Sequence, residues 1–89
     1  MTFSEFGRRV AENASQGTDH GTANNIFLVG GSLKTCGVYN NPSDLQKLED
    51  GDLLVDIDFR QVYATLLSNW MGVDSDKILL QEFDRLQFV

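Results

Sequence analysis

The chain has only one cysteine, one histidine and one proline, and it has no long run of apolar residues. Because Cys36 is alone, it cannot form a disulfide within the chain, so the sequence leaves the redox compartment undetermined. We interpret Cys36 as a thiol without a functional role. No apolar stretch approaches the roughly 20 residues that span a bilayer, and the first residues lack the basic and apolar regions of a signal peptide. The sequence therefore predicts no transmembrane segment.

Basic residues are also few. Seven Lys and Arg side chains stand against thirteen Asp and Glu, which gives a formal net charge of −6, and ten of the acidic residues lie at or after Asp44. A surface that binds the phosphate backbone of a nucleic acid needs positive charge. Nucleic acid is therefore not an expected partner.

The length of the chain allows one small domain. Eighty-nine residues, 42% of them hydrophobic, can form a single core over residues 1–89. A domain of this size buries only about 60 to 65% of the surface of its unfolded chain, so its stability is modest. Met1-Thr2-Phe3 leads directly into Ser4-Glu5-Phe6-Gly7, with no room for a preceding element. We therefore interpret the chain as part of a longer fold.

A short apolar run, Ile26-Phe27-Leu28-Val29, is closed by Gly30-Gly31. Continuous apolar runs of this length are typical of strands that are buried on both faces. The run therefore predicts a strand in a covered sheet.

Weaker patterns lie between this run and the next helix. Ser43-Asp44-Leu45-Gln46 has a capping-box pattern that predicts one or two helical turns. Asp50-Gly51-Asp52 predicts a turn, and residues 53–57 predict a brief extended segment.

The strongest helical pattern covers residues 59–71. Its apolar residues follow the three-four spacing of a single stripe. Asp58 is suited to the N-cap with Gln61 at the third helical position, and Gly72 suits the left-handed position after the helix.

The end of the chain predicts a second, shorter helix. It should begin at Asp74 or Ser75 and carry Ile78 and Leu79. The tail over residues 83–88 is apolar enough to dock on another element.

The stretch from Asn13 to Asn25 is rich in Gly, Asn, Ser and Thr and predicts a long polar loop. Loops of this length in compact domains are usually functional or disordered, so we expect function over residues 13–25. The loop places Asp19 next to His20 between glycines. Carboxylate and imidazole are ligands for Zn²⁺, Mn²⁺ or Fe, and glycines let the backbone approach an ion. The alternative interpretation is that both are ordinary polar turn residues.

Five motifs occur in order along the chain. They are Thr2-Phe3-Ser4-Glu5-Phe6-Gly7-Arg8, Gly17-Thr18-Asp19-His20-Gly21, Gly51-Asp52-Leu53, Asp58-Phe59-Arg60 with Val62-Tyr63, and Trp70-Met71-Gly72-Val73-Asp74. As a set, they resemble the C-terminal part of the sulfatase-like family called domain of unknown function 1501. The resemblance covers nearly the whole chain.

The resemblance implies an α/β fold of the alkaline phosphatase and sulfatase superfamily, in which a three-layer sheet binds metal ions at the C-terminal ends of its strands. This chain would be a C-terminal fragment of that fold, with short strands near residues 1–4 and 26–30 and a main helix near residues 59–71. Full-length relatives usually look exported through a twin-arginine signal, which implies an extracytoplasmic or periplasmic location.

The resemblance admits two alignments of the metal ligands. In the superfamily one strand commonly ends in Ser-Asp-His-Gly, and Asp19-His20-Gly21 matches that ending. In the second alignment, Ser4-Glu5-Phe6-Gly7 ends that strand, so Glu5 replaces the aspartate and Phe6 replaces the histidine. His20 then precedes the apolar run 26–30, as a later metal-binding histidine does in the superfamily. We prefer the second alignment because it accounts for both motifs and for the run.

In both alignments Asp19 and His20 are the leading ligands of a divalent metal, Zn²⁺ or Mn²⁺, and Glu5 joins them in the second. Arg8 is the candidate for binding an anionic substrate. Glu5 could equally form a surface ion pair with Arg8 or Arg9, worth roughly 0 to 1 kcal/mol. A catalytic metal normally needs at least three protein ligands. The chain contains neither the superfamily's nucleophile nor its other metal-binding carboxylates, so we expect it to be inactive alone.

Two functions remain open. The chain is either the C-terminal segment of a metal-dependent hydrolase-like protein that acts on phosphate or sulfate esters, or a non-catalytic module that self-associates. If the apolar residues 26–29 and 83–89 cannot be covered within one chain, self-association or a missing N-terminal portion is required.

Overall fold

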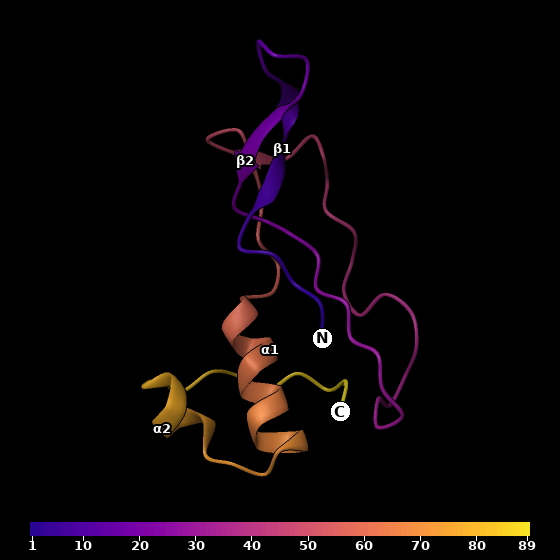
Figure 1. The fold of residues 1–89 in the computed structure, drawn as a ribbon, viewed down its shortest axis with the longest axis vertical. Coiled ribbons are helices and arrows are strands. Elements are labelled where there is room, and N and C mark those ends of the chain that lie inside the picture. Colours follow the sequence, from indigo (N-terminus) through magenta and orange to yellow (C-terminus); the bar gives the residue numbers. More distant parts are fainter. The chain divides into compact units, whose positions relative to one another are not determined.

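The computed structural model describes residues 1–89, which form a small mixed α/β structure (Figure 1). It divides into two compact units, unit 1 (residues 1–29 and 41–56) and unit 2 (residues 30–40 and 57–89). Unit 1 holds the strands and unit 2 the helices. The elements are β1 (Gly7–Glu12), β2 (Thr18–Gly21), β3 (Leu48–Glu49), β4 (Asp52–Leu53), α1 (Phe59–Thr65), the π-helical turn η1 (Leu66–Trp70) and α2 (Ser75–Leu79). The predicted mixture of strands and helices is confirmed, whereas the three-layer sheet is not.

Strands β1 and β2 form an antiparallel hairpin in unit 1 (Figure 1). The tight connection is built by Asn13, whose side-chain oxygen accepts hydrogen bonds from the backbone N–H groups of Ser15 and Gly17, both at 3.0 Å. The polar stretch 13–25 is therefore not one continuous irregular loop. Part of it pairs with β1, a non-local contact that its polar composition does not signal.

Strands β3 and β4 form a second hairpin around Asp50 and Gly51. Both residues have positive φ angles, 50° and 83°, which is the conformation of a two-residue type I′ turn. The predicted turn is confirmed. Upstream, the predicted helical turns are absent. Residues 43–47 form only a non-helical turn, in which Asp44 accepts a hydrogen bond from the backbone N–H of Gln46.

The apolar run 26–29 makes a single antiparallel bridge, in which Phe27 and Thr2 exchange two backbone hydrogen bonds of 2.8 and 3.0 Å. The short strands expected near residues 1–4 and 26–30 are not present as strands, and only this bridge joins the two segments. The run is not buried on both faces, because Phe27 is 64% exposed and Val29 is 95% exposed. The expectation of a covered strand was wrong for this chain, since a single bridge leaves the rest of the run without a neighbour.

Helix α1 continues into η1, so that helical structure covers residues 59–70. Asp58 caps α1 by accepting from the backbone N–H of Arg60, and the side-chain oxygen of Gln61 accepts a hydrogen bond from the backbone N–H of Asp58. Gly72 follows with a φ of 69°. The predicted helix, its capping box and its glycine stop are confirmed, because all three depend on local sequence.

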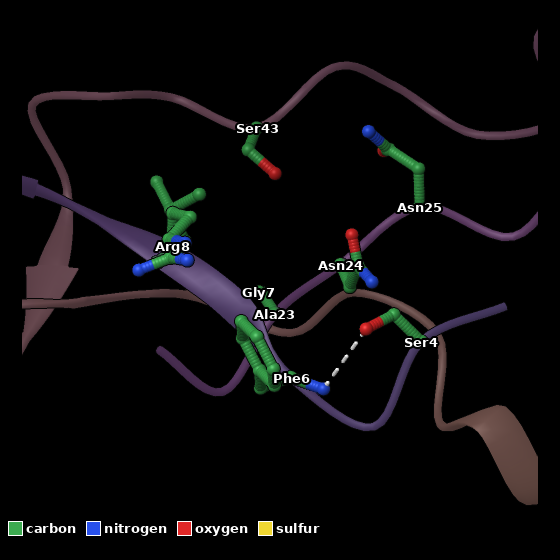
Figure 2. Close-up of a pocket in the computed structure, with 9 residues that line it drawn as sticks. Ser4, Phe6, Gly7, Arg8, Ala23, Asn24, Asn25 and Ser43 are labelled. Atoms are coloured by element: carbon green, nitrogen blue, oxygen red, sulfur yellow. Dashed lines mark hydrogen bonds between the residues drawn. The ribbon is translucent and has the colours of Figure 1, made fainter. Parts of the chain in front are cut away.

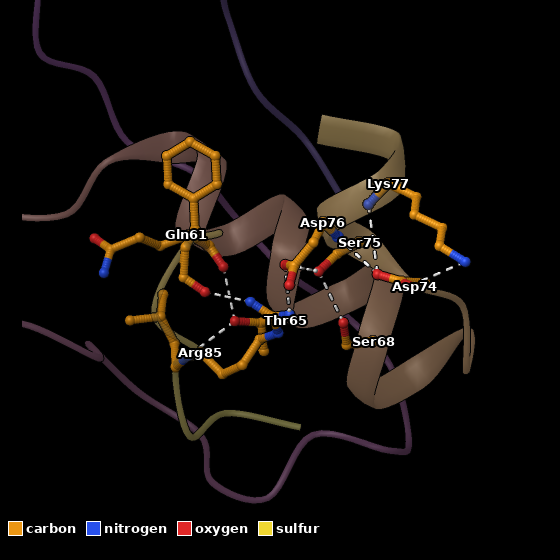
Figure 3. Close-up of polar contacts among 10 residues, drawn as sticks. Gln61, Thr65, Ser68, Asp74, Ser75, Asp76, Lys77 and Arg85 are labelled. Atoms are coloured by element: carbon orange, nitrogen blue, oxygen red, sulfur yellow. Dashed lines mark hydrogen bonds and ion pairs between the residues drawn. The ribbon is translucent and has the colours of Figure 1, made fainter. Parts of the chain in front are cut away.

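Helix α2 begins after Asp74, whose carboxylate accepts from the backbone N–H groups of Asp76 and Lys77 (Figure 3). The predicted start of the second helix is therefore confirmed. The helices are short, and neither has the length and apolarity that crossing a bilayer requires.

The core of unit 2 is formed by the buried side chains of Val62 and Ala64, which belong to α1, and of Phe88 in the C-terminal tail. Thr65 is fully buried, and its hydroxyl donates to the carbonyl of Gln61 at 2.7 Å and accepts from the N–H of Leu86 at 2.8 Å (Figure 3). The C-terminal tail is thus docked on the helix, as its apolar composition predicts.

Candidate functional site

The β1–β2 hairpin brings together the residues that the sequence singles out. Its register places Arg8 directly opposite His20. Cross-strand partners lie on the same face, so Arg8 and His20 share one face. The register shifts between Arg8 and Glu12, and alternation within β2 turns Asp19 to the other face. The adjacent pair Asp19-His20 is therefore divided between the two faces of the hairpin.

On the first face, Phe6 contacts both members of the pair. Its ring stacks on the imidazole of His20 with the ring centroids 3.7 Å apart and the planes at 10°. The guanidinium carbon of Arg8 lies 5.2 Å from the centroid of the same ring, within the range of a cation–π contact. Arg8 also donates a hydrogen bond from Nη1 to the carbonyl of Thr18 at 2.7 Å. The backbone of β2 thus holds the guanidinium in place.

On the second face, Arg9 joins the two hairpins of unit 1. It donates from Nε to Asp52 Oδ1 at 3.1 Å and from Nη2 to the carbonyl of Asp50. The hydrogen bond with Asp52 and its negative charge raise the pKa of Arg9, and the nearby charge of Asp19 raises it further. Asp19 accepts a hydrogen bond from the amide of Asn13 at 3.1 Å. The carboxylate of Asp19 is thus engaged on the face away from His20.

The three expected metal ligands are not gathered around one point. Asp19 and His20 lie on opposite faces, and the Glu5 carboxylate accepts from the Ser4 hydroxyl at 3.4 Å. No three His, Cys, Asp or Glu side chains lie close enough together to hold an ion. The residues present do not fit a complete metal site. Of the three, His20 is the one whose side-chain nitrogen atoms make no hydrogen bond to the chain.

A pocket of about 460 Å³ opens beside Arg8 (Figure 2). In its lining the backbone of Gly7 lies close to Ala23, because an added Cβ at Gly7 would lie 1.5 Å from the carbonyl oxygen of Ala23. Arg8 is the only charged residue in the lining, so the pocket contains no carboxylate. The lining residues are Ser4, Phe6, Gly7, Arg8, Ala23, Asn24, Asn25, Ser43 and Leu53.

Arg8 differs from the other arginines of the chain. Each of the other three forms an ion pair with an aspartate, at 2.6 to 3.2 Å, whereas Arg8 forms none. Unit 1 nevertheless carries eight acidic side chains and only three basic ones. An exposed guanidinium without a carboxylate partner, in an acidic unit and beside a pocket, is free to bind an anion through its planar donors.

Sequence reasoning missed the uncharged part of the pocket. Asn24, Asn25 and Ser43 line it, and their side chains make no hydrogen bond to the rest of the chain. The two asparagines follow His20 within the stretch that was expected to be functional. No sequence signal connects them with Ser43, because the fold alone brings these segments together.

Comparison with known proteins identifies one family. The family described as protein of unknown function (DUF1501) matches residues 1–87. Searches of curated proteins and of solved structures find no match. Because the matched region spans almost the entire sequence, the chain belongs to the DUF1501 family.

Proposed function

We propose that this chain supplies the anion-binding part of a hydrolase-like protein that acts on phosphate or sulfate esters. The observation that carries the proposal is the position of Arg8, the one arginine without an ion pair and the only charge around the pocket. The anionic oxygen atoms of a phosphate or sulfate ester match the parallel N–H donors of a guanidinium. No carboxylate is among the residues that line the pocket, and the Glu5 carboxylate hydrogen-bonds to the lining residue Ser4.

The resemblance to sulfatase-like proteins supports an ester as the group that reacts. The same resemblance implies that the reaction depends on Zn²⁺ or Mn²⁺. The proposal assigns the metal role first to His20, whose ring nitrogens make no hydrogen bond to the chain. Asp19 and Glu5 do not gather with His20 into one group of ligands. Either would bind the metal only together with ligands from outside these 89 residues. Hydrolysis by this chain alone is not part of the proposal.

The first test measures anion binding by the 89-residue chain. Sulfate and phosphate are titrated at constant ionic strength while the backbone amide shifts of residues 6–8 and 23–25 are followed by NMR. We expect saturable shifts in the parent chain and a loss of affinity of about 10- to 100-fold in Arg8→Gln, from the loss of about 1.5–3 kcal/mol of charged hydrogen bonding. Lys34→Gln removes the same charge in unit 2 and should leave binding unchanged. Equal affinities of Arg8→Gln and the parent would refute the proposal.

The second test addresses the metal separately. Isothermal titration with Zn²⁺ and Mn²⁺ compares the parent chain with His20→Ala. Weak binding that disappears in the variant supports a ligand role for His20, whereas identical isotherms contradict it. Hydrolysis is then assayed in full-length family members with nitrophenyl phosphate and nitrophenyl sulfate.

A second candidate function is self-association, which the exposure of Phe27 and Val29 favours. Clusters of exposed apolar residues mark interaction surfaces, and an extended segment with a free edge can pair with another chain. Light scattering during size-exclusion chromatography, with and without Zn²⁺, should show an oligomer that Val29→Asp dissociates. Val38→Asp is the matched control, since Val38 is 81% exposed in unit 2. A monomer at all concentrations would exclude this function.

A further inference from the structure

The helical segment of residues 59–70 carries a second apolar face in addition to the one that unit 2 buries. It consists of large apolar side chains spaced four, three and four residues apart, which places them on one side of the helix. We name Phe59, Tyr63, Leu66 and Trp70 the outer stripe. Ala64 and Thr65, which are fully buried, lie on the opposite side of the helix. The outer stripe therefore turns away from the core of unit 2.

The two ends of the outer stripe are its most exposed parts. Phe59 is 55% exposed and Trp70 is 63% exposed, whereas Tyr63 and Leu66 are half-buried. The Phe59 ring meets the Tyr63 ring edge to face, with 5.4 Å between the centroids, so these two side chains form one continuous surface. A helix that is apolar on both sides is typically covered on both sides. The outer stripe therefore has the character of an interface.

The outer stripe carries no unpaired charge. Between Asp58 and Asp74 the only charged residue is Arg60, and it forms an ion pair with Asp58 at 2.6 Å. After the stripe, Lys77 pairs with Asp74 at 3.8 Å. In a chain with a formal net charge of −6, two copies repel each other unless they meet on a neutral surface. The outer stripe is such a surface, and it offers nothing to a strongly charged partner.

A second copy of the same helix complements the outer stripe. When two copies pair antiparallel about a two-fold axis, Phe59 of one copy faces Trp70 of the other, and Tyr63 faces Leu66. This arrangement also sets opposite ends of the two helix dipoles side by side.

We propose that the outer stripe is a dimer interface, on which the outer stripe of a second copy of this chain packs antiparallel. The inference rests on the self-association named above as the second candidate function. It adds a surface in unit 2 to the edge at Val29 in unit 1.

The size of the surface predicts a weak dimer. Aromatic side chains bury about 150–250 Å² each, so the exposed parts of Phe59 and Trp70 contribute roughly 200–300 Å² per copy. Stable interfaces bury about 1,200–2,000 Å² in total, so we expect this dimer only at about 0.1–1 mM protein.

The test follows Trp70, which is the only tryptophan of the chain. Fluorescence and sedimentation equilibrium are measured on the 89-residue chain and on Val29→Asp, which disrupts the edge in unit 1. We expect both proteins to dimerise and their emission to move to shorter wavelength as the concentration rises from about 1 µM to 1 mM. Isotope-filtered NMR of mixed labelled and unlabelled chains should show contacts between Phe59 of one copy and Trp70 of the other.

Variants assign the dimer to the outer stripe. Phe59→Glu keeps the fluorescent probe and puts an acidic residue in the first turn of α1, where it favours the helix, so the fold should persist. Its dimer should dissociate at least tenfold more readily than that of the parent. Val38→Asp introduces a charge at a residue of unit 2 outside the helices and should change nothing. Circular dichroism verifies the helix content of each variant.

The outcomes separate the interface from self-association in general. If Val29→Asp abolishes all association and Phe59→Glu none of it, the edge in unit 1 mediates self-association and the outer stripe is refuted as an interface. If the parent chain is a monomer at every concentration, both are refuted. A dimer whose intermolecular contacts lie outside the outer stripe would also overturn the inference.

Discussion

The imidazole of His20 stacks on the phenyl ring of Phe6, with 3.7 Å between the ring centroids and an angle of 10° between the planes. This contact gives His20 a packing role that is independent of metal binding. Stacked aromatic pairs are worth about 0.5–1.5 kcal/mol beyond the area they bury. His20, which the sequence predicts to be a metal ligand, therefore also packs against Phe6, a residue that lines the pocket beside Arg8.

Substitution of His20 can separate the two roles. His20→Phe keeps a flat ring against Phe6 but has no ligand atom, whereas His20→Ala removes both. We expect His20→Ala to lower the free energy of unfolding by about 0.5–1.5 kcal/mol and to weaken sulfate binding, and His20→Phe to preserve both properties. Zn²⁺ binding should disappear in both variants. Equal destabilisation by the two substitutions in urea denaturation would contradict the packing role.

Gly7→Ala should disrupt the pocket. The new Cβ would lie 1.5 Å from the carbonyl oxygen of Ala23, so the backbone of one of the two segments must move. Such overpacking typically lowers the free energy of unfolding by about 1–3 kcal/mol, and here sulfate binding should be lost as well. Gly17→Ala is the matched control, because its Cβ would meet only the Asn13 side chain at 3.8 Å. Unchanged amide shifts near residue 23 in Gly7→Ala would argue against this close approach.

Asp52→Asn should loosen the connection between the two hairpins of unit 1. The substitution removes the charge that holds Arg9 and raises its pKa. We expect faster hydrogen exchange at the amides of β1 and β4, with unit 2 unaffected. Asp50→Asn serves as the control, because Arg9 hydrogen-bonds to Asp50 only through its backbone carbonyl and the charge of Asp50 is the smallest influence on the pKa of Arg9; asparagine tolerates the φ of 50°. Similar exchange rates in the two variants would mean that the ion pair does not hold the hairpins together.

Asp58 should make the stability of unit 2 depend on pH in the acid range. The hydrogen bond from Arg60 holds the pKa of the Asp58 carboxyl below its ordinary value. The charged form is therefore favoured by folding, and its contribution is present at neutral pH and lost as the pH falls below about 4.

Two substitutions at this position separate the cap from the charge. Asp58→Ala should lower the free energy of unfolding at pH 7 by about 1 kcal/mol through loss of the cap. Asp58→Asn should keep most of the cap and remove this part of the acid dependence. Circular dichroism of urea unfolding between pH 3 and 7 measures both effects. An acid dependence in Asp58→Asn equal to that of the parent would show that other carboxylates are responsible.

Thr65→Val should detach the C-terminal tail from α1. Valine has nearly the same shape but cannot accept the hydrogen bond from the Leu86 N–H, which threonine accepts at 2.8 Å. An unsatisfied buried donor costs about 1–3 kcal/mol, and the amide of Leu86 should exchange faster with solvent. Thr65→Ser retains the hydroxyl and should retain the protection of Leu86. Full protection of that amide in Thr65→Val would contradict the predicted role of the hydroxyl.

The sequence by itself determined the helical part of this protein. Asp58, Gln61 and Gly72 mark the ends of the main helix, and Asp74 marks the start of the next. Capping and left-handed stops involve hydrogen bonds and backbone angles within a few residues, so their signals are readable along the chain. The turn at Asp50-Gly51 was predictable for the same reason.

Only the tertiary structure decided the candidate site. The register of β1 against β2 places Arg8 opposite His20, and a shift of this pairing by one residue would turn His20 to the other face. Arg9 meets Asp52 across 43 positions of sequence, and Ser43 lines the same pocket as Asn24 and Asn25 although it follows them by 19 and 18 positions. Such pairings depend on which distant segments pack together, and neither composition nor local spacing encodes that choice.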